Sequence, residues 1–434
     1  MNNILKAVED YINNKSKKTW IPGHDWVQYA GPYFDSEEYT LAIQSLLEGW
    51  LVLGHNGIKF ENIFPKLLNK DFGLLTNSGS SSNLLMMSAL TSKRLYNLPK
   101  GTKVITPIAG FPTTINPIFQ TGFEPVFVDI ELDTLNLNLE QVEEKAKQGC
   151  KVITFAHVLG NPPNMDCLMK IVKDYDLILL EDCCDALGST YKDNPLGSFG
   201  EFASCSFYPA HHMTIGEGGF IACKTQEQEI ILRSFRDWGR GCYCVGQKAN
   251  LLKNGCCGKR FSNWLPSLPD EVFDHKYVYD EIGYNLKPIE LQAAIGLAQI
   301  KKLPTIHQLR KANHKRLYDI FSKYEEYFIL PKATEHSDPS WFAFALTIKD
   351  NDKFKRKDII NYFEDHKIQT RPYFAGNIML QPAYSGMLNE HDIIKNYPNA
   401  RKVTTDTFFL GTSPVITEEQ LNYIEKIVFK FINR

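Results

Sequence analysis

The chain has 434 residues, of which 43% are hydrophobic and 12% aromatic, so it can form two packed domains with apolar cores. Its formal net charge of −2 gives no reason to expect nucleic acid or an anionic membrane as a partner. The longest apolar runs are too short to cross a bilayer, and the N-terminal stretch lacks the apolar core of a signal peptide. We therefore expect a cytoplasmic protein.

Short apolar runs alternate with helical patterns between about residues 70 and 225. Continuous runs of this kind are typical of strands buried on both faces. They occupy residues 103–107, 124–130, 151–157, 176–182, 203–209 and 218–223. The alternation predicts an α/β fold with a doubly wound, mixed but mostly parallel sheet, in which ligands bind at the carboxyl ends of the strands.

A smaller α+β unit is predicted after this sheet. Its strand, helix, second strand and final helix are expected at residues 342–348, 355–366, 367–374 and from 418 on, the last after a capping box at 417–420. We expect a large domain over residues 1–300, which includes the N-terminal segment and a cysteine-rich loop at 240–260. The small domain would then cover residues 301–434.

Two motifs in the first half of the sheet have the chemistry of a cofactor site. Gly79, Ser80 and Ser81 stand at the start of a helix, where free N–H groups and hydroxyls can hold an anion, although the string also fits a plain helix N-cap. Phe111 follows a strand and could stack on a flat heterocycle, or could be a core residue.

Two further motifs add a carboxylate and a histidine. Asp182 ends a strand and could keep a pyridine nitrogen protonated, or could cap a helix. Ser206 is placed for a second phosphate contact, and His211 lies between it and a glycine-rich turn.

The order and spacing of these motifs resemble the fold-type I pyridoxal-phosphate enzymes, which have the aspartate aminotransferase-like fold. The resemblance is closest to the branch of sugar-nucleotide aminotransferases and dehydratases, and it extends through residues 34–54, 156–166 and 283–299. It implies that Asp182 pairs with the pyridine nitrogen, that Phe111 stacks on the ring, and that a further set of residues completes the cofactor site: Gly79, Ser80, Ser81, Asp185, Ser206 and, from the neighbouring subunit of a homodimer, Asn285.

The departure from this family is His211, which stands where the Schiff-base lysine would be. An imidazole cannot form an imine, so the resemblance implies pyridoxamine phosphate held without a covalent bond, with His211 moving protons and Tyr208 assisting it or shaping the pocket. Such a site can remove a hydroxyl from a 4-keto sugar but cannot complete an ordinary transamination. His212 is a second candidate base, although we expect its side chain to point elsewhere.

The ten cysteines separate two kinds of 3-dehydratase. The CDP-4-dehydro-6-deoxyglucose 3-dehydratase family, which this chain resembles, carries a [2Fe–2S] cluster on a cysteine followed by 57 residues, then Cys-x-Cys, then a fourth cysteine. Here residues 185–241, fifty-seven in all, separate Cys184 from Cys242, Cys244 follows, and Cys257 precedes Gly-Lys-Arg-Phe, with Cys256 as the alternative fourth ligand. Zinc and free thiols remain alternatives. The scattered Cys150, Cys167, Cys205 and Cys223 are expected to be small buried apolar residues.

The resemblance implies a complete reaction system. The substrate would be an NDP-4-keto-6-deoxyhexose, above all the CDP-glucose derivative, on a route to 3,6-dideoxysugars of lipopolysaccharide O-antigen, with Arg371 or Asn377 as contacts. Electrons would come from an NADH-dependent flavin/iron–sulfur reductase. The alternatives are a cluster-free GDP-4-keto-6-deoxymannose 3-dehydratase, a catalytically silent homologue that binds the cofactor, and an ordinary aminotransferase.

Overall fold

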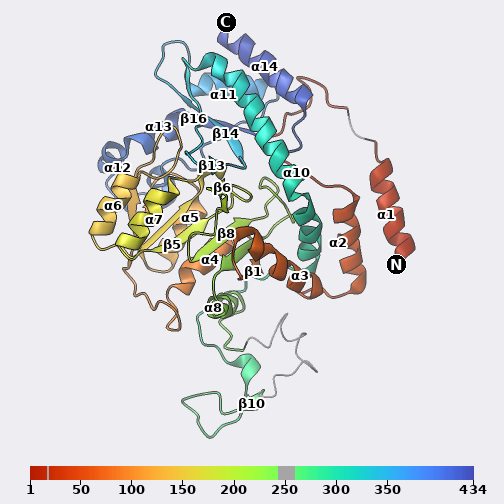
Figure 1. Ribbon diagram of the computed structural model, residues 1–434, viewed down its shortest axis with the longest axis vertical. Coiled ribbons are helices and arrows are strands. Elements are labelled where there is room, and N and C mark those ends of the chain that lie inside the picture. The colour runs from red at the N-terminus through yellow and green to blue at the C-terminus, as the bar shows by residue number, and fades with distance from the viewer. Residues whose placement is uncertain (17–18, 243–259) are drawn as a thin grey trace.

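The computed structural model describes residues 1–16, 19–242 and 260–434. Its centre is a seven-stranded sheet with the strand order β1-β9-β8-β5-β4-β2-β3. The strands β2, β3, β4, β5 and β8 are parallel to one another, and β9 runs antiparallel to both β8 and β1. Helices cover both faces of this sheet (Figure 1). The prediction of a doubly wound, mixed and mostly parallel sheet is confirmed.

The six predicted strands are all present, with bounds that differ by at most three residues from those expected. They are β2 (Lys103–Pro107), β3 (Glu124–Val128), β4 (Val152–Ala156), β5 (Ile178–Asp182), β8 (Phe202–Ser206) and β9 (Gly219–Cys223). The seventh strand, β1 (Phe72–Thr76), was not predicted. It is an edge strand that pairs only with β9 in this sheet.

Successive residues of the central strands enter two different cores. Ile105, Ile153 and Leu179 belong to a core that is completed by helices on one face. Their neighbours Val104, Val152 and Leu180 belong to a core on the opposite face. Side chains alternate across a strand, so both faces must be apolar here, which explains the continuous apolar runs in the sequence.

The helices of the large domain flank these two cores. Those that contribute to the first core are α3 (His55–Ile63), α6 (Leu139–Lys147), α7 (Met165–Asp174) and the first half of α10 (Glu290–Phe321). Those that contribute to the second are α4 (Gly79–Ala89), α5 (Pro112–Gln120) and α8 (Gln226–Arg236). The helices α1 (Asn2–Asn14) and α2 (Ser36–Glu48) lie at the outer edge, and α2 packs on α10.

The small domain is built on a second sheet with the order β12-β14-β16-β15. Its strands are β12 (Phe328–Ile329), β14 (Ala343–Ile348), β15 (Arg371–Pro372) and β16 (Thr407–Gly411), and its helices are α11 (Arg356–Asp365), α12 (Glu390–Asn396), α13 (Pro398–Asp406) and α14 (Glu418–Ile432). The predicted capping box is confirmed, because the Thr417 side chain accepts from Gln420 N and Gln420 caps Thr417 N in return. The predicted strand at 367–374 is reduced to two residues.

Helix α10 belongs to both domains. Leu303 is part of the core under the large sheet, whereas Leu317, on the same helix, is part of the small-domain core. The predicted division at residue 300 therefore falls inside one continuous helix. Figure 1 shows α10 running from the large sheet toward α14. The N-terminal segment also crosses over, because Val27 pairs with Ile368 and is buried in the small-domain core.

A buried histidine on α10 should make the folded chain sensitive to acid. The His314 ring stacks on Trp341 with centroids 4.0 Å apart, and burial lowers the pKa of His314 to about 3. The unfolded chain binds this proton near pH 6.5, whereas the folded chain does not, so the stabilisation is complete above pH 6.5 and decreases as the pH falls toward 3.

We expect the free energy of unfolding to fall by up to about 1.4 kcal/mol per pH unit for this one group below pH 6.5. His314→Gln should remove that contribution to the slope between pH 6.5 and 4.5, as measured by urea unfolding. The matched variant of the exposed His55, His55→Gln, should leave the slope unchanged. Equal slopes for the wild type and His314→Gln would contradict the prediction.

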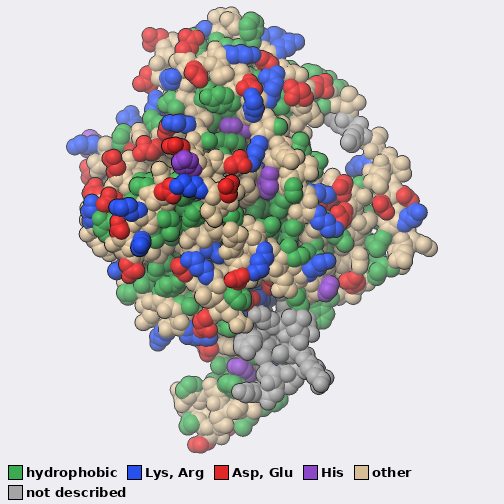
Figure 2. Space-filling model, in the orientation of Figure 1, with side chains coloured by type: hydrophobic (Ala, Val, Ile, Leu, Met, Phe, Trp, Pro, Cys, Tyr) green, Lys and Arg blue, Asp and Glu red, His purple; other side chains and the backbone are tan. Residues whose placement is uncertain are grey.

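Two further features concern the surface charge and the length of the helices. Figure 2 shows acidic and basic side chains interspersed over the viewed face. Across the described ranges, no helix combines the length and the apolar character that spanning a membrane requires.

Candidate active site

A cavity of about 930 Å³ opens where four strands of the large sheet end. Its lining includes the last residues of β2, β4, β5 and β8, which are Pro107, Ala156, Asp182 and Ser206. The opposite wall comes from the small domain, with Phe342, Arg371, Tyr373 and Phe374 among its residues. The carboxyl edge of the sheet thus forms the floor of the cavity, which is the predicted place for a ligand.

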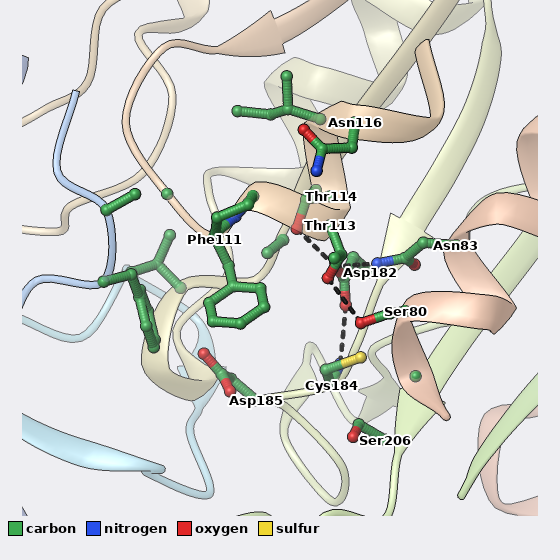
Figure 3. A pocket seen from close by; sticks show the side chains of 18 of the residues that line it. Ser80, Asn83, Phe111, Thr113, Thr114, Asn116, Asp182, Cys184, Asp185 and Ser206 are labelled. Atoms are coloured by element: carbon green, nitrogen blue, oxygen red, sulfur yellow. Dashed lines mark hydrogen bonds between the residues drawn. The ribbon is translucent and has the colours of Figure 1, made fainter. Parts of the chain in front are cut away.

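Asp182 is the buried anion at the centre of this floor (Figure 3). Its Oδ2 accepts hydrogen bonds from Asn83 Nδ2 and Thr114 Oγ1, both at 2.7 Å. Its Oδ1 accepts from the N–H of Cys184 at 3.1 Å and from Ser204 Oγ at 3.4 Å. These donors are all neutral, and no lysine or arginine among the described residues lies within ion-pair distance. The cavity therefore offers an uncompensated carboxylate to a cationic ring nitrogen.

The N-terminus of α4 forms one end of the cavity. Gly79 has to be glycine because a Cβ atom there would lie 2.5 Å from Ser206 Cβ. Gly79, Ser80 and Ser206 all line the cavity, and Ser80 Oγ donates to Thr113 Oγ1 at 2.9 Å. Ser81 does not line it, because its N–H and hydroxyl bond to the Ser78 side chain. The first helical N–H groups and the two hydroxyls suit a phosphate.

Phe111 and Tyr208 present exposed rings to the cavity. Phe111 caps α5, is 49% exposed, and contacts the Phe374 ring edge to face at 5.8 Å. Its alternative interpretation as a core residue is wrong, because a core ring would be buried. Tyr208 is 47% exposed, and its ring lies 6.5 Å from that of His211.

His211 lies next to a carboxylate, that of Asp185, in the lining of the cavity. Its Nδ1 lies 3.4 Å from Asp185 Oδ1, and its ring lies 5.3 Å from that of Phe342. Burial raises the pKa of Asp185, and the attraction of His211 opposes that shift. Asp185 lines the cavity as predicted, and its contact with His211 was not foreseen. The carboxylate therefore lies on the Nδ1 side of the ring at ion-pair distance, and among the described residues Nδ1 makes no hydrogen bond.

His212 points away from this site. It is buried, and its Nε2 contacts the carbonyl of Ser340 at 2.7 Å. Burial and the charge of Arg310 hold its pKa well below the usual value. The expectation that its side chain points elsewhere is confirmed.

Three predicted contacts have different positions relative to the cavity. Arg371 lines it, donates to the carbonyl of Thr370, and stacks on the ring of Tyr29 with its Cζ 4.3 Å from the centroid. Asn377 does not line it, because it is fully buried and its side chain accepts from Met379 N. Asn285 is exposed, bonds to Lys287 at 2.8 Å, and does not line the cavity of its own chain.

Only part of the predicted cysteine set falls on the described residues. Cys184 lines the cavity, and a Cβ at Gly79 would lie 3.0 Å from its Sγ. Burial and the charge of Asp182 raise the pKa of its thiol. Cys242 is buried, and Cys244, Cys256 and Cys257 lie outside the described residues. Of the scattered cysteines, Cys167 is exposed, which corrects the expectation that all four are buried.

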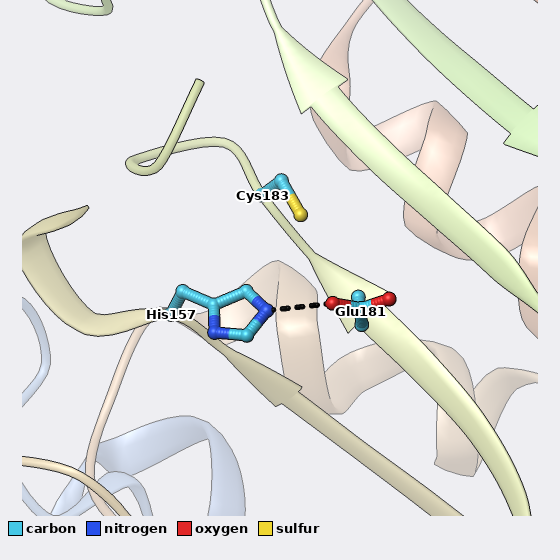
Figure 4. A group of neighbouring side chains, drawn as sticks. All are labelled: His157, Glu181 and Cys183. Carbon is cyan, nitrogen blue, oxygen red and sulfur yellow. Dashed lines mark hydrogen bonds and ion pairs between the residues drawn. The ribbon is translucent and has the colours of Figure 1, made fainter. Parts of the chain in front are cut away.

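A buried pair beside Asp182 fixes the end of β5 (Figure 4). His157 Nε2 lies 3.0 Å from Glu181 Oε1, and Cys183 lies close to both. Burial alone would raise the pKa of Glu181, but His157 and the N–H of Gly200 bring it below its usual value. Because the two carboxylate oxygens also accept from Gly197 N and Gly200 N, we interpret the group as structural and not as a metal site.

The chain is similar to known proteins over most of its length. The sequence profile of the DegT/DnrJ/EryC1/StrS aminotransferase family matches residues 32–429. The chain is 41% identical to the lipopolysaccharide biosynthesis protein RfbH of Salmonella typhimurium, over 97% of this chain and 95% of that protein. It is 39% identical to the dTDP-4-dehydro-2,6-dideoxy-D-glucose 3-dehydratase of Saccharopolyspora spinosa, over 99% and 91%.

A solved structure agrees with the family match. The E. coli GDP-4-keto-6-deoxy-D-mannose-3-dehydratase with bound hydrated PLP superposes with a TM-score of 0.79 at 29% identity, covering 93% of this chain and 100% of that one. The prediction of a fold-type I, aspartate aminotransferase-like fold is thereby confirmed.

Proposed function

The chain belongs to the DegT/DnrJ/EryC1/StrS aminotransferase family, and we propose that it is a pyridoxamine-phosphate-dependent 3-dehydratase of an NDP-4-keto-6-deoxyhexose. The observation that carries this proposal is the place of His211. It lies in the cavity beside Asp185, where an aminotransferase of this family would have its imine-forming lysine. A site with a proton-transferring imidazole in the place of that amine suits removal of the 3-hydroxyl better than amination.

The cavity suits pyridoxamine phosphate at three points. Asp182 would hold the ring nitrogen, Phe111 would cover the ring, and the start of α4 with Ser80 and Ser206 would hold the phosphate. When bound, this cofactor supplies an amine for the 4-keto group and a ring that accepts electrons. Asp182 is buried, so it would meet the charge of the nitrogen where solvent screens the pairing little.

His211 would move the proton in this reaction. With Asp185 on the Nδ1 side, Nε2 would be the nitrogen that takes a proton from the cofactor's methylene carbon and delivers one to the departing hydroxyl. Tyr208, exposed next to it, could assist the second transfer.

For the substrate we propose CDP-4-keto-6-deoxy-D-glucose, on a route to the 3,6-dideoxysugars of a surface glycan such as O-antigen. The relatives named above support a nucleotide sugar, and RfbH is by its name a lipopolysaccharide biosynthesis protein. Arg371, stacked on Tyr29 in the cavity wall, would contact the anionic diphosphate.

The site would be shared between two copies of the chain. Asn285, exposed and held by Lys287, would reach the phosphate in the partner subunit's cavity. An apolar surface of Leu51, Val52 and Ile289 is exposed nearby, and Val52 pairs with Ile289. Exposed apolar surface of this kind favours a homodimer.

We further propose a [2Fe–2S] cluster on Cys184, Cys242, Cys244 and Cys257. The cysteine spacing and the position of Cys184 in the cavity support it, and a cluster of this type supplies electrons one at a time. An NADH-dependent flavin/iron–sulfur reductase would deliver them.

Anaerobically purified protein should therefore contain about two iron and two sulfide per chain. Cys184→Ser should lose most of both, because a hydroxyl is a poor ligand for iron–sulfur clusters. Cys167→Ser, at an exposed cysteine outside the set, should keep them. Iron and sulfide analysis with visible absorption measures this. Wild-type protein without iron would favour the cluster-free dehydratase.

The proposed activity is tested with pyridoxamine phosphate, a reductase and a panel of CDP-, dTDP- and GDP-4-keto-6-deoxysugars. Loss of the 3-oxygen, measured by mass spectrometry, should be fastest with the CDP sugar. Transfer of an amino group to the sugar would indicate an ordinary aminotransferase. Absence of exchange at the cofactor's methylene carbon with every sugar would indicate a silent homologue.

A further inference from the structure

Arg310 is a fully buried guanidinium that bonds to main-chain carbonyls instead of carboxylates. It lies on α10 and is 1% exposed. Its NH2 group donates to the carbonyls of Ala210 at 3.0 Å and His211 at 2.9 Å. Its NH1 group donates to the carbonyl of Phe342 at 3.1 Å and, more weakly, to that of Trp341 at 3.5 Å. In the part of the chain that the structure describes, it has no carboxylate within ion-pair distance.

The other large buried arginines are arranged differently. Arg233 donates to the carboxylates of Glu61 and Glu229 at 3.0 and 2.7 Å, and Arg236 bonds to Asp237. Such pairing is the usual way to bury a guanidinium, because an uncompensated charge is costly to desolvate. Arg310 has only main-chain carbonyls as hydrogen-bond partners, and Asp185 attracts its charge from beyond ion-pair distance, so its place in the fold has a different explanation.

The four carbonyls belong to two segments. One carries the imidazole of His211, and the other packs against it. Ala210 and His211 form the turn that carries the imidazole, and the ring of Phe342, on the small-domain side, lies 5.3 Å from the His211 ring. The planar fork of one arginine therefore fixes the turn to the wall against which the imidazole packs. The His211 backbone has one more tie, since its N–H donates to the carbonyl of Tyr208 at 3.0 Å.

We propose that Arg310 is a positioning residue for His211. By holding the turn, Arg310 keeps the imidazole with Nδ1 toward Asp185 and Nε2 toward the cavity. This inference rests on the proposed function only in giving His211 the role of base. The orientation itself is a property of the chain that can be observed without substrate. Small losses of alignment at a reacting centre are expensive, so a loosened turn should slow proton transfer strongly.

The test uses the full-length chain with ¹⁵N-labelled histidine, with and without pyridoxamine phosphate. Imidazole ¹⁵N shifts report which ring nitrogen carries the proton, and His211→Asn identifies the His211 signals. The wild type should show His211 with the proton on Nδ1. Arg310→Lys, which keeps the charge but loses the fork, should show a mixture of both tautomers. With pyridoxamine phosphate and the CDP-4-keto-6-deoxy sugar supplied, it should exchange the cofactor's methylene proton about 10-fold more slowly. Arg310→Met should be slower by about 100-fold.

Arg233→Lys is the matched control, because it also replaces a buried guanidinium fork, on α8 and away from the cavity. It should lower Tm and leave both the His211 shifts and the exchange rate unchanged. Wild-type shifts and rates in the Arg310 variants would overturn the proposal, and if Arg310→Met does not fold, Arg310→Lys decides alone. Failure of the proposed function has another signature: no exchange in the wild type, with the tautomer comparison still measurable.

Discussion

His211→Asn should reduce exchange of the cofactor's methylene proton, and removal of the 3-hydroxyl, by about 10²–10⁴-fold. The asparagine amide has nearly the shape of part of the imidazole but cannot accept and return a proton near neutral pH. Binding of pyridoxamine phosphate should change little, because Asp182, Phe111 and the start of α4 remain in place. Proton–deuterium exchange is measured by NMR, and cofactor binding is measured separately by absorbance.

The neighbouring histidine gives a close control. His212→Asn removes a buried imidazole that contacts the Ser340 carbonyl outside the cavity. It should lower Tm but keep the exchange rate within a few-fold of the wild type. His211→Lys should restore the missing amine, so that pyridoxal phosphate becomes covalently attached and absorbs accordingly. A His211→Asn enzyme that exchanges at the wild-type rate would remove the basis of the proposed function.

The sequence predicted the parts of the fold that depend on local patterns. Continuous apolar runs identified β2, β4, β5, β8 and β9, which are buried on both faces, and the edge strand β3, which is buried only at its carboxyl end. The edge strand β1 was missed. The domain boundary was placed at residue 300, after an apolar helical stretch that ends there in the prediction. Only the tertiary packing shows that Leu303 and Leu317, on one helix, enter different cores.

The site was predicted where a motif has its own chemical signature, and missed where only folding brings residues together. Asp182 and His211 could be selected from sequence. The groups that hold Asp182 could not, because Asn83 and Thr114 are 99 and 68 residues away from it in the chain. Arg310 was missed for the same reason, being 99 residues from His211. Asn377 was selected because its segment resembles the one that meets the substrate in the family, but its side chain is used in a local turn.

Asp182→Asn and Glu181→Gln should have opposite effects, although they change neighbouring buried carboxylates. Asp182 accepts four neutral hydrogen bonds and has no cationic partner among the described residues. Removing its charge should change Tm of the cofactor-free protein little, because the loss of an uncompensated buried charge offsets the hydrogen bonds that the amide nitrogen cannot accept. The same change should slow proton exchange by about 10²–10³-fold, since the ring nitrogen loses its counter-charge.

Glu181 is instead engaged by His157 and two backbone N–H groups. Glu181→Gln should therefore destabilise the fold by about 1–3 kcal/mol and leave the chemistry nearly intact. Thermal unfolding without cofactor and exchange rates with it separate the two effects. A lower Tm for Asp182→Asn with an unchanged rate would mean that its carboxylate is structural and that the cofactor ring lies elsewhere. The two variants differ because of what each carboxylate contacts. A charge that has no cationic partner in the fold is available to a ligand, whereas one that is paired within the fold contributes to stability.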